Sequence, residues 1–148
     1  MQDKIEQDLK QALLAGDKQK AETLRTIKSS ILNEAIAQGA RDSGLSDEQI
    51  QTILARESKK RQEAADLYEK GGAADRASAE LAEKTIIDSY LPEQLTEEEV
   101  AKAVDEEIAK QDSPTMQDMG RIIGAVRGRL GAQADGALIA KLVKEKLS

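Results

Sequence analysis

The stretch "LPEQLTEEEV", residues 91–100, divides the chain into two parts and shows what kind of structure follows the division. Pro92 cannot continue a helix, and it pushes the preceding residue out of helical geometry. Thr96 then supplies an N-cap side chain, and the three glutamates after it place negative charge at the positive end of a new helix. We therefore predict two domains, residues 1–92 and residues 93–148.

In the first part, apolar residues recur every three or four positions, which is the spacing of one face of a helix. Asp17 and Ser46 are N-cap residues, and Gly39 and the glycine pair at 71–72 end helices. These signals predict a short first helix ending near Gly16 and helices over about residues 18–38, 47–70 and 75–90. The predicted core stripes of the first three helices are Ile5, Leu9 and Leu13; Leu24, Ile27, Ile31, Leu32 and Ala35; and Ile50, Ile53, Leu54, Leu67 and Tyr68.

The second part shows the same helical signals. They predict helices over about residues 97–110, 116–130 and 136–147. Thr115 or Ser113 starts the middle one, Gly131 ends it, and Asp135 caps the last, which begins at Gly136. Because no segment alternates with the period of two that strands require, we predict an all-α fold. Its two parts are an N-terminal antiparallel helical domain and a small C-terminal three-helix domain.

The composition excludes several kinds of enzyme chemistry. The chain has 148 residues, of which 39% are hydrophobic, and it contains neither histidine nor cysteine. Without these residues, Cys/His zinc sites and Ser–His or Cys–His nucleophile pairs are excluded. Neither a GxxxxGK[ST] phosphate loop nor a GxGxxG motif occurs. We therefore expect no catalytic residue, no metal site and no cofactor, and a chain that is not catalytic by itself.

Charge and hydropathy indicate the cellular compartment of the protein and the kinds of partner that it can bind. No stretch approaches 18 apolar residues, the N-terminus has no apolar leader, and the lack of cysteine fits a reducing compartment. We expect a cytoplasmic protein without membrane association. The net charge of -6 argues against strong nonspecific binding to nucleic acid, and no DNA partner is expected. Residues 93–112 carry eight acidic and two basic residues, whereas residues 113–148 carry three acidic and six basic ones.

The segment "MGRIIGAVRGRLGAQADG", residues 119–136, contains five of the ten glycines. At about 100° per residue, Gly120, Gly124 and Gly128 form a stripe nearly opposite the apolar face of the predicted helix. Arg121 and Arg127 flank this stripe, about 60° to either side of its centre. Because an interior helical glycine costs about 1 kcal/mol relative to alanine, we expect something to approach this face. The candidates are another helix of the chain, a partner protein or a nucleic-acid backbone.

The second and third predicted helices carry charged residues within or beside their apolar stripes. Glu57 and Arg61 are four residues apart on one face, which suits an ion pair. Arg25, Lys28 and Glu34 lie in or next to the stripe of the preceding helix. We predict a charge network that fixes the register of the helices, with a Lys28–Glu57 or a Glu34–Arg61 contact. The alternative is a functional polar groove between the helices.

Three blocks of sequence together resemble the GatB/YqeY family, and specifically its small stand-alone YqeY-like members. The blocks are "LRTIKSSILNEAI" (24–36), "KKRQEAADLYEKGGAADRASAELAEKTIIDSYLPEQLTEEEV" (59–100) and "DMGRIIGAVRGRLGAQADGALIAKLVKEKL" (118–147). The residues that carry the resemblance are Leu24, Arg25, Lys28, Glu34, Arg61, Glu63, Tyr68, Glu80, Glu83, Tyr90, Leu91, Pro92, Gln94, Leu95, Gly120, Gly124, Ala134 and Asp135.

The resemblance implies an all-helical fold of two parts, the second similar to the tail domain of the B subunit of glutamine-dependent aspartyl/glutamyl-tRNA amidotransferase. In that enzyme the tail helps to hold tRNA. Family labels of carbon–nitrogen ligase activity with glutamine as amido donor are interpreted as inherited by similarity, because this chain lacks the amidase machinery. Relatives commonly have a basic residue where this chain has Ala132 and Gln133, and Arg127 and Arg129 are expected to compensate.

These observations support two hypotheses over a third, in which the chain is an amidotransferase-type enzyme. In the first, the chain is an accessory protein that binds tRNA or another RNA and needs no cofactor. Its binding residues would be Gly120, Arg121, Gly124, Arg127, Gly128, Arg129 and Asp135. In the second, it is a non-catalytic protein–protein adaptor that receives a helix of its partner on the same face.

Overall fold

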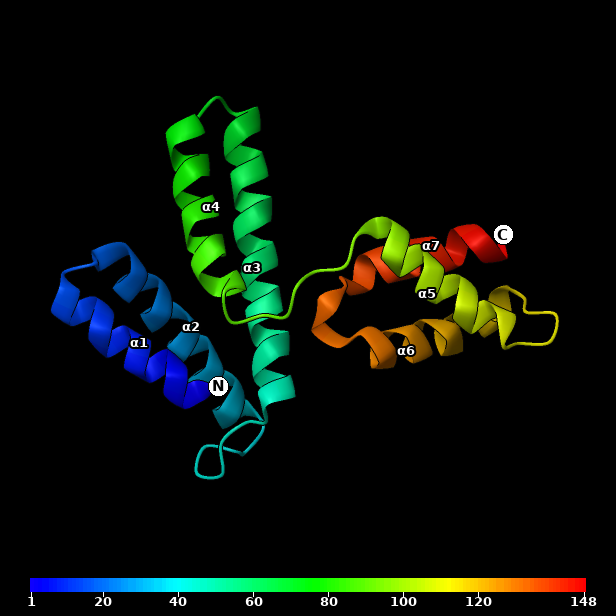
Figure 1. Ribbon diagram of the computed structural model, residues 1–148, viewed down its shortest axis with the longest axis horizontal. Helices are drawn as coiled ribbons and strands as arrows, with labels where there is room; N and C mark the ends of the chain where they lie inside the picture. Colours follow the sequence, from blue (N-terminus) through cyan, green and yellow to red (C-terminus); the bar gives the residue numbers. More distant parts are fainter. The chain divides into compact units, whose positions relative to one another are not determined.

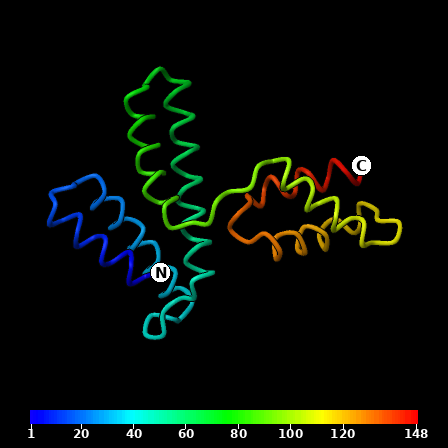
Figure 2. The backbone as a smooth tube through the Cα atoms, in the orientation of Figure 1, coloured from blue at the N-terminus to red at the C-terminus, as the bar shows by residue number.

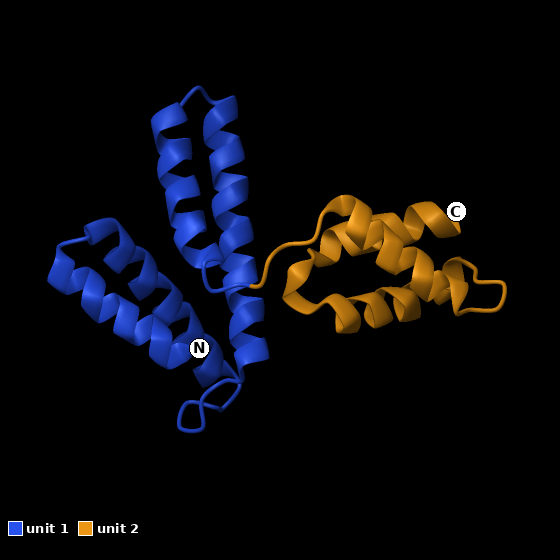
Figure 3. Cartoon of the chain, viewed as in Figure 1, with its two compact units in different colours: residues 1–91 blue, residues 92–148 orange.

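The computed structural model describes residues 1–148, and all its regular elements are helices, so the predicted all-α fold is confirmed. The chain forms two compact units, Met1–Leu91 (unit 1) and Pro92–Ser148 (unit 2) (Figure 3). That each unit folds alone as a domain stays a prediction. Unit 1 contains α1 (Gln2–Ala15), α2 (Lys18–Ala37), α3 (Asp47–Lys70) and α4 (Ala74–Asp88) (Figure 1).

Unit 1 consists of two antiparallel hairpins, α1 with α2 and α3 with α4 (Figure 2). Their shared core contains only aliphatic side chains, because the chain has no phenylalanine or tryptophan. Ala65 and Ala77 are the buried residues of the outer half of the α3–α4 hairpin, so small side chains let these two helices approach closely. The core consists of Ile5, Leu9, Ala12, Ala21, Leu24, Ile27, Ile31, Ile50, Ile53, Leu54 and Ile87.

Local hydrogen bonds explain why the helices of unit 1 begin and end where they do. The Asp17 carboxylate accepts from the backbone N–H of Lys20 at 3.1 Å and caps α2. Ser46 and Gln49 form the predicted capping box of α3, in which each side chain accepts from the other residue's backbone N–H. Gly16 ends α1 with a φ of 72°, a left-handed conformation that glycine adopts without strain.

Three of the predicted core positions in unit 1 are wrong, because the structure exposes their side chains. Leu67 lies in the last turn of α3, past the shared core. Leu13 directly follows the buried Ala12, so its side chain points about 100° away from that core residue. Leu32 follows Ile31 directly, so its side chain points about 100° away from the buried stripe of α2. It is 46% exposed, whereas Ile31 is 2% exposed.

A hydrogen bond joins the first helix of unit 1 to the end of the last one. The Tyr90 hydroxyl donates to Oδ2 of Asp8, which Lys4 also approaches at 3.3 Å. Donation from Tyr90, supported by Lys4, holds the pKa of Asp8 below its ordinary value, although burial opposes the shift. Burial and the adjacent carboxylate both raise the pKa of Tyr90. The contact therefore links α1 to the end of α4 through a carboxylate that stays ionised at neutral pH.

Tyr90→Phe is expected to lower the free energy of unfolding of unit 1 by about 1 kcal/mol at pH 7, because the Asp8 carboxylate loses the Tyr90 donor and keeps only Lys4. A carboxylate whose pKa is lowered by folding stabilises the protein above its ordinary pKa, and this stabilisation disappears as pH falls through the folded-state pKa. The deficit should therefore vanish in strong acid. Tyr68→Phe is the control, since the Tyr68 ring lies 6.0 Å from Arg76 but its hydroxyl makes no hydrogen bond. Urea denaturation between pH 7 and pH 2 measures both variants, and equal deficits would contradict the prediction.

Unit 2 consists of three helices and two short 3-10 turns around a separate core. Its elements are α5 (Glu97–Ala109), η1 (Met116–Asp118), α6 (Met119–Leu130), η2 (Gly131–Gln133) and α7 (Gly136–Leu147). The segment before α5 is tied to η2, because Leu95 N–H donates to the Gln133 carbonyl at 2.9 Å and the Gln94 side chain donates to the Ala132 carbonyl at 2.6 Å. Its core consists of Val100, Ala103, Val104, Ile122, Val126, Leu130, Ile139, Leu142 and Val143.

The caps of unit 2 agree with the helix starts predicted for residues 97 and 136. The Thr96 hydroxyl oxygen accepts from the N–H of Glu99 at 3.2 Å, and the Asp135 carboxylate accepts from the N–H of Ala137 at 3.2 Å. The predicted middle helix begins as the 3-10 turn η1, and Thr115 rather than Ser113 is its cap. Gly131 ends α6 with a φ of 56°, so a residue with a side chain would be strained there.

Candidate functional site

The face of α6 that carries the glycine stripe is open within unit 2. Gly120, Gly124 and Gly128 are exposed, and a Cβ atom built on any of them meets no atom within 4 Å. Ile122 and Val126, on the other side of the helix, are buried against α5 and α7. No other element of unit 2 therefore needs glycine at these three positions.

Arg121 and Arg127 lie at the two edges of the stripe and have different surroundings. The Arg121 side chain is 64% exposed, and its Nη2 lies 2.8 Å from Oδ1 of Asp118. The Arg127 guanidinium lies over the start of α7, where its Cζ would be 3.3 Å from a Cβ at Gly136. A side chain at the first position of α7 would therefore require this flexible guanidinium to shift by a few tenths of an ångström. Asp135 precedes Gly136 and acts as the N-cap of that helix.

Arg129, which is also one of the expected binding residues, lies away from this face. At about 100° per residue it lies roughly 140° from the centre of the glycine stripe, on the side of α6 that meets α5. Its guanidinium lies 2.5 Å from Glu106 and 3.7 Å from Glu107, both on α5. The hydrogen bond from Arg129 holds the pKa of Glu106 below its ordinary value. Arg129 therefore joins α6 to α5.

A second polar cluster, in unit 1, surrounds Arg61. The guanidinium lies 2.9 Å from Glu57 on its own helix, in the ion pair that their spacing predicts, and 3.0 Å from Glu83 on α4. Glu80 is a third carboxylate, at 3.9 Å. Ser30 of α2 donates to Glu57 at 3.3 Å, so the cluster connects three helices. Glu57 is almost fully buried, and its partners stabilise the charge that burial would otherwise disfavour.

The predicted contacts between α2 and α3 are wrong in their partners. Lys28 lies 3.6 Å from Glu6 of α1, because it points away from α3. Glu34 accepts from Gln38, one turn later on α2, at 2.8 Å. Arg25 is exposed and forms no ion pair. The α2 residue that contacts Glu57 is the small, uncharged Ser30, which a pattern of charged residues does not reveal.

Glu80 and Glu83 were also missed as partners of Arg61, although the sequence contains a signal for them. In an antiparallel helical hairpin, residues equally distant from the turn face each other. The turn between α3 and α4 is centred near Gly72, which places residue 61 opposite residue 83. Counting outward from the glycine pair would have found the ion pair between the two helices.

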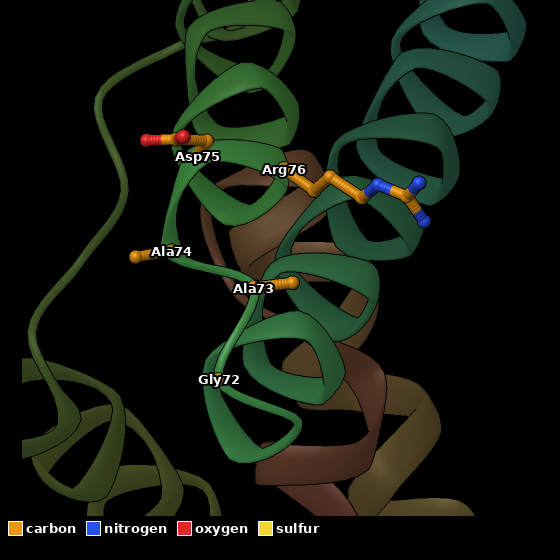
Figure 4. A pocket seen from close by; sticks show the side chains of 5 residues that line it. All are labelled: Gly72, Ala73, Ala74, Asp75 and Arg76. Atoms are coloured by element: carbon orange, nitrogen blue, oxygen red, sulfur yellow. The ribbon is translucent and has the colours of Figure 1, made fainter.

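A hollow of about 320 Å³ lies beside the α3–α4 turn, and few of the side chains that line it are polar (Figure 4). Asp75 and Arg76 contribute its only ionisable side chains, and they point in different directions. No group of three or more carboxylates is arranged to hold a metal ion. None of the helices combines the length and the apolar character needed to cross a membrane.

Comparison with known proteins gives one result that covers nearly the whole chain. The family model described as "Yqey-like protein" matches residues 2–147. No curated protein matches the chain. The family match includes both the cluster around Arg61 and the glycine stripe of α6.

Proposed function

Because the chain belongs to the Yqey-like protein family, we propose that it is a non-catalytic accessory protein that binds tRNA or another structured RNA. The α6 face formed by Gly120, Gly124 and Gly128, with Arg121 and Arg127 at its edges, would be the binding surface. The single observation that carries the proposal is that this glycine stripe is open within unit 2. Three helical glycines lower helix stability, and no packing in unit 2 compensates for them.

The chemistry of the face suits a phosphate backbone. Glycines let a bulky, regular ligand approach the helix axis closely, and guanidinium groups at both edges bind phosphates through charge-assisted hydrogen bonds. The net charge of -6 opposes long-range attraction of RNA, so we expect modest affinity and strong salt dependence. The resemblance to an amidotransferase tail domain, inferred from the sequence motifs alone, favours RNA as the ligand and the cytoplasm as the place of binding. It does not imply ligase chemistry in this chain.

The double variant Arg121→Ala/Arg127→Ala is expected to weaken the binding of fluorescently labelled, unfractionated tRNA about tenfold at low salt, because two guanidinium groups no longer bind phosphates. The slope of log affinity against log salt concentration should fall by about one for each arginine removed from a phosphate. Fluorescence anisotropy titrations of the full chain at several salt concentrations measure both quantities.

Arg129→Ala is the matched control for this experiment. It removes one positive charge from the same helix, as each of the single variants Arg121→Ala and Arg127→Ala does, but its guanidinium is paired with Glu106 on the side facing α5. It should therefore change the affinity for tRNA much less than loss of Arg127 does. If the unaltered chain binds no tRNA, or if Arg129→Ala weakens binding as much as the double variant does, the proposal is wrong.

The adaptor hypothesis uses the same open face and makes a different prediction about salt. A helix of a partner protein docked on the stripe should be released by Gly124→Leu and should respond little to ionic strength. The structure has room for that side chain, since a Cβ at Gly124 meets nothing within 4 Å. A salt-insensitive protein complex that Gly124→Leu abolishes, without tRNA binding, would favour the adaptor.

A further inference from the structure

Arg121 already has an anionic partner on the face where RNA would bind. Its Nη2 lies 2.8 Å from Oδ1 of Asp118, and the two side chains are 64% and 30% exposed. A carboxylate at this distance cancels much of the guanidinium's attraction for an approaching phosphate, because the phosphate feels both opposite charges. At this edge of the face the attraction of Arg121 for a phosphate is therefore reduced, even though the guanidinium is exposed.

Asp118 is held in place independently of Arg121. Its second oxygen, Oδ2, accepts from the backbone N–H of Thr115 at 2.9 Å. The Thr115 hydroxyl oxygen accepts from the N–H of Gln117 at 3.3 Å, and together these contacts make the capping box of η1. The carboxylate is therefore fixed by backbone geometry, and a ligand cannot displace it without disturbing the start of η1.

We propose that Asp118 competes with the phosphate of the ligand for Arg121, and that this autoinhibitory ion pair keeps the α6 face in a weakly binding state. The inference rests on the proposed RNA binding and adds its regulation. To contact a phosphate fully, the Arg121 guanidinium has to exchange Oδ1 of Asp118 for a phosphate oxygen. Neutralising Asp118 removes the competitor and leaves the arginine in place.

Asp118→Asn tests the inference in the full chain, because an asparagine oxygen still accepts from Thr115 N–H but carries no charge. We expect unfractionated tRNA to bind about two- to fivefold more tightly at low salt, which is the range that an exposed ion pair contributes. The gain should shrink as salt screens both contacts. Asp118→Ser, which also retains a short oxygen acceptor, repeats the test if the asparagine variant folds poorly by circular dichroism.

Asp112→Asn is the matched control. Asp112 is exposed in the loop between α5 and η1 and forms no ion pair, so its variant changes the net charge equally without freeing an arginine. The second control is the Arg121→Ala background, in which Asp118→Asn should give no gain beyond that of Asp112→Asn. The two controls separate release of Arg121 from a general effect of charge.

The outcomes distinguish the inference from the function on which it rests. Equal gains from Asp118→Asn and Asp112→Asn, or a full gain without Arg121, would overturn the inference while RNA binding stands. A loss of affinity in Asp118→Asn would also overturn it, because Asp118 would then orient Arg121 for the ligand. If the unaltered chain binds no tRNA, the proposed function fails first and the inference fails with it.

Discussion

Arg61→Met is expected to lower the free energy of unfolding of unit 1 by about 2 to 4 kcal/mol, the largest effect that a polar substitution should have in this protein. Arg61 is the main cationic partner of the almost fully buried Glu57 and also neutralises Glu83 across the α3–α4 hairpin. Methionine keeps most of the length and the apolar contacts of the side chain, but it leaves the Glu57 and Glu83 carboxylates without the positive charge of Arg61. Lys60, at 3.3 Å from Glu57 and largely exposed, compensates only in part.

The pH dependence of this loss identifies its cause. Burial raises the pKa of Glu57, but hydrogen bonds from Arg61 and Lys60 outweigh burial and hold the pKa below its ordinary value of 4.5. Glu57 therefore stabilises unit 1 above that value, and this contribution is lost as pH falls through the folded-state pKa. In Arg61→Met burial dominates, the pKa of Glu57 rises, and protonation relieves the buried charge. The difference between the two proteins should shrink from pH 7 towards pH 4.

Arg56→Met is the control for Arg61→Met. Arg56 lies on the same helix, is exposed and forms no ion pair, so its replacement should change the free energy of unfolding by less than about 0.5 kcal/mol. Urea denaturation at several pH values measures both variants. A similar loss in both, or a loss for Arg61→Met that does not depend on pH, would show that the cluster does not stabilise a buried charge.

Replacing Gly120, Gly124 and Gly128 together by alanine is expected to raise the free energy of unfolding of unit 2 by about 2 kcal/mol. Alanine reduces the conformational freedom of the unfolded chain, and all three positions have helical backbone with open space around the added methyl groups. The same variant should bind tRNA more weakly, because the methyl groups keep the phosphate backbone away from the helix. A more stable protein that binds less well would show that these glycines serve the ligand rather than the fold.

The control for this triple variant is Ala125→Gly, on the exposed side of the same helix. It should lower the stability of unit 2 by about 0.5 to 1 kcal/mol, which calibrates the effect of one glycine in α6. Thermal and urea unfolding followed by circular dichroism give both values. If the triple variant is no more stable than the unaltered chain, the glycines are already in close contact with something, and the open face proposed for RNA is wrong.

Helix positions were predictable from the sequence because the signals that start and stop helices are local. Ser46 with Gln49, Thr96 and Asp135 each cap a helix through contacts within three residues, and Gly16 and Gly131 end helices through their own backbone conformation. The glycine stripe was predictable for the same reason, since it depends only on helical geometry within one segment.

Contacts between helices were predicted less well, because they depend on how each helix is rotated against its neighbours. A charged side chain beside an apolar stripe can contact the helix on either side of that stripe. For Lys28 the sequence alone does not show whether the partner lies on α3 or, as the structure has it, on α1. Arg129 illustrates the same difficulty, since its partner Glu106 is 23 positions away on another helix. Ser30 was missed because a small polar residue within a helix gives no signal until its neighbour is known.

The absence of large aromatic side chains from unit 2 has a spectroscopic consequence. The chain has no tryptophan or phenylalanine, and both of its tyrosines, Tyr68 and Tyr90, lie in unit 1. Intrinsic fluorescence therefore reports on unit 1 alone, whereas the far-ultraviolet signal of the helices comes from both units. Unfolding that changes ellipticity without changing tyrosine emission belongs to unit 2. The two native tyrosines thus distinguish the unfolding of unit 1 from the unfolding of unit 2.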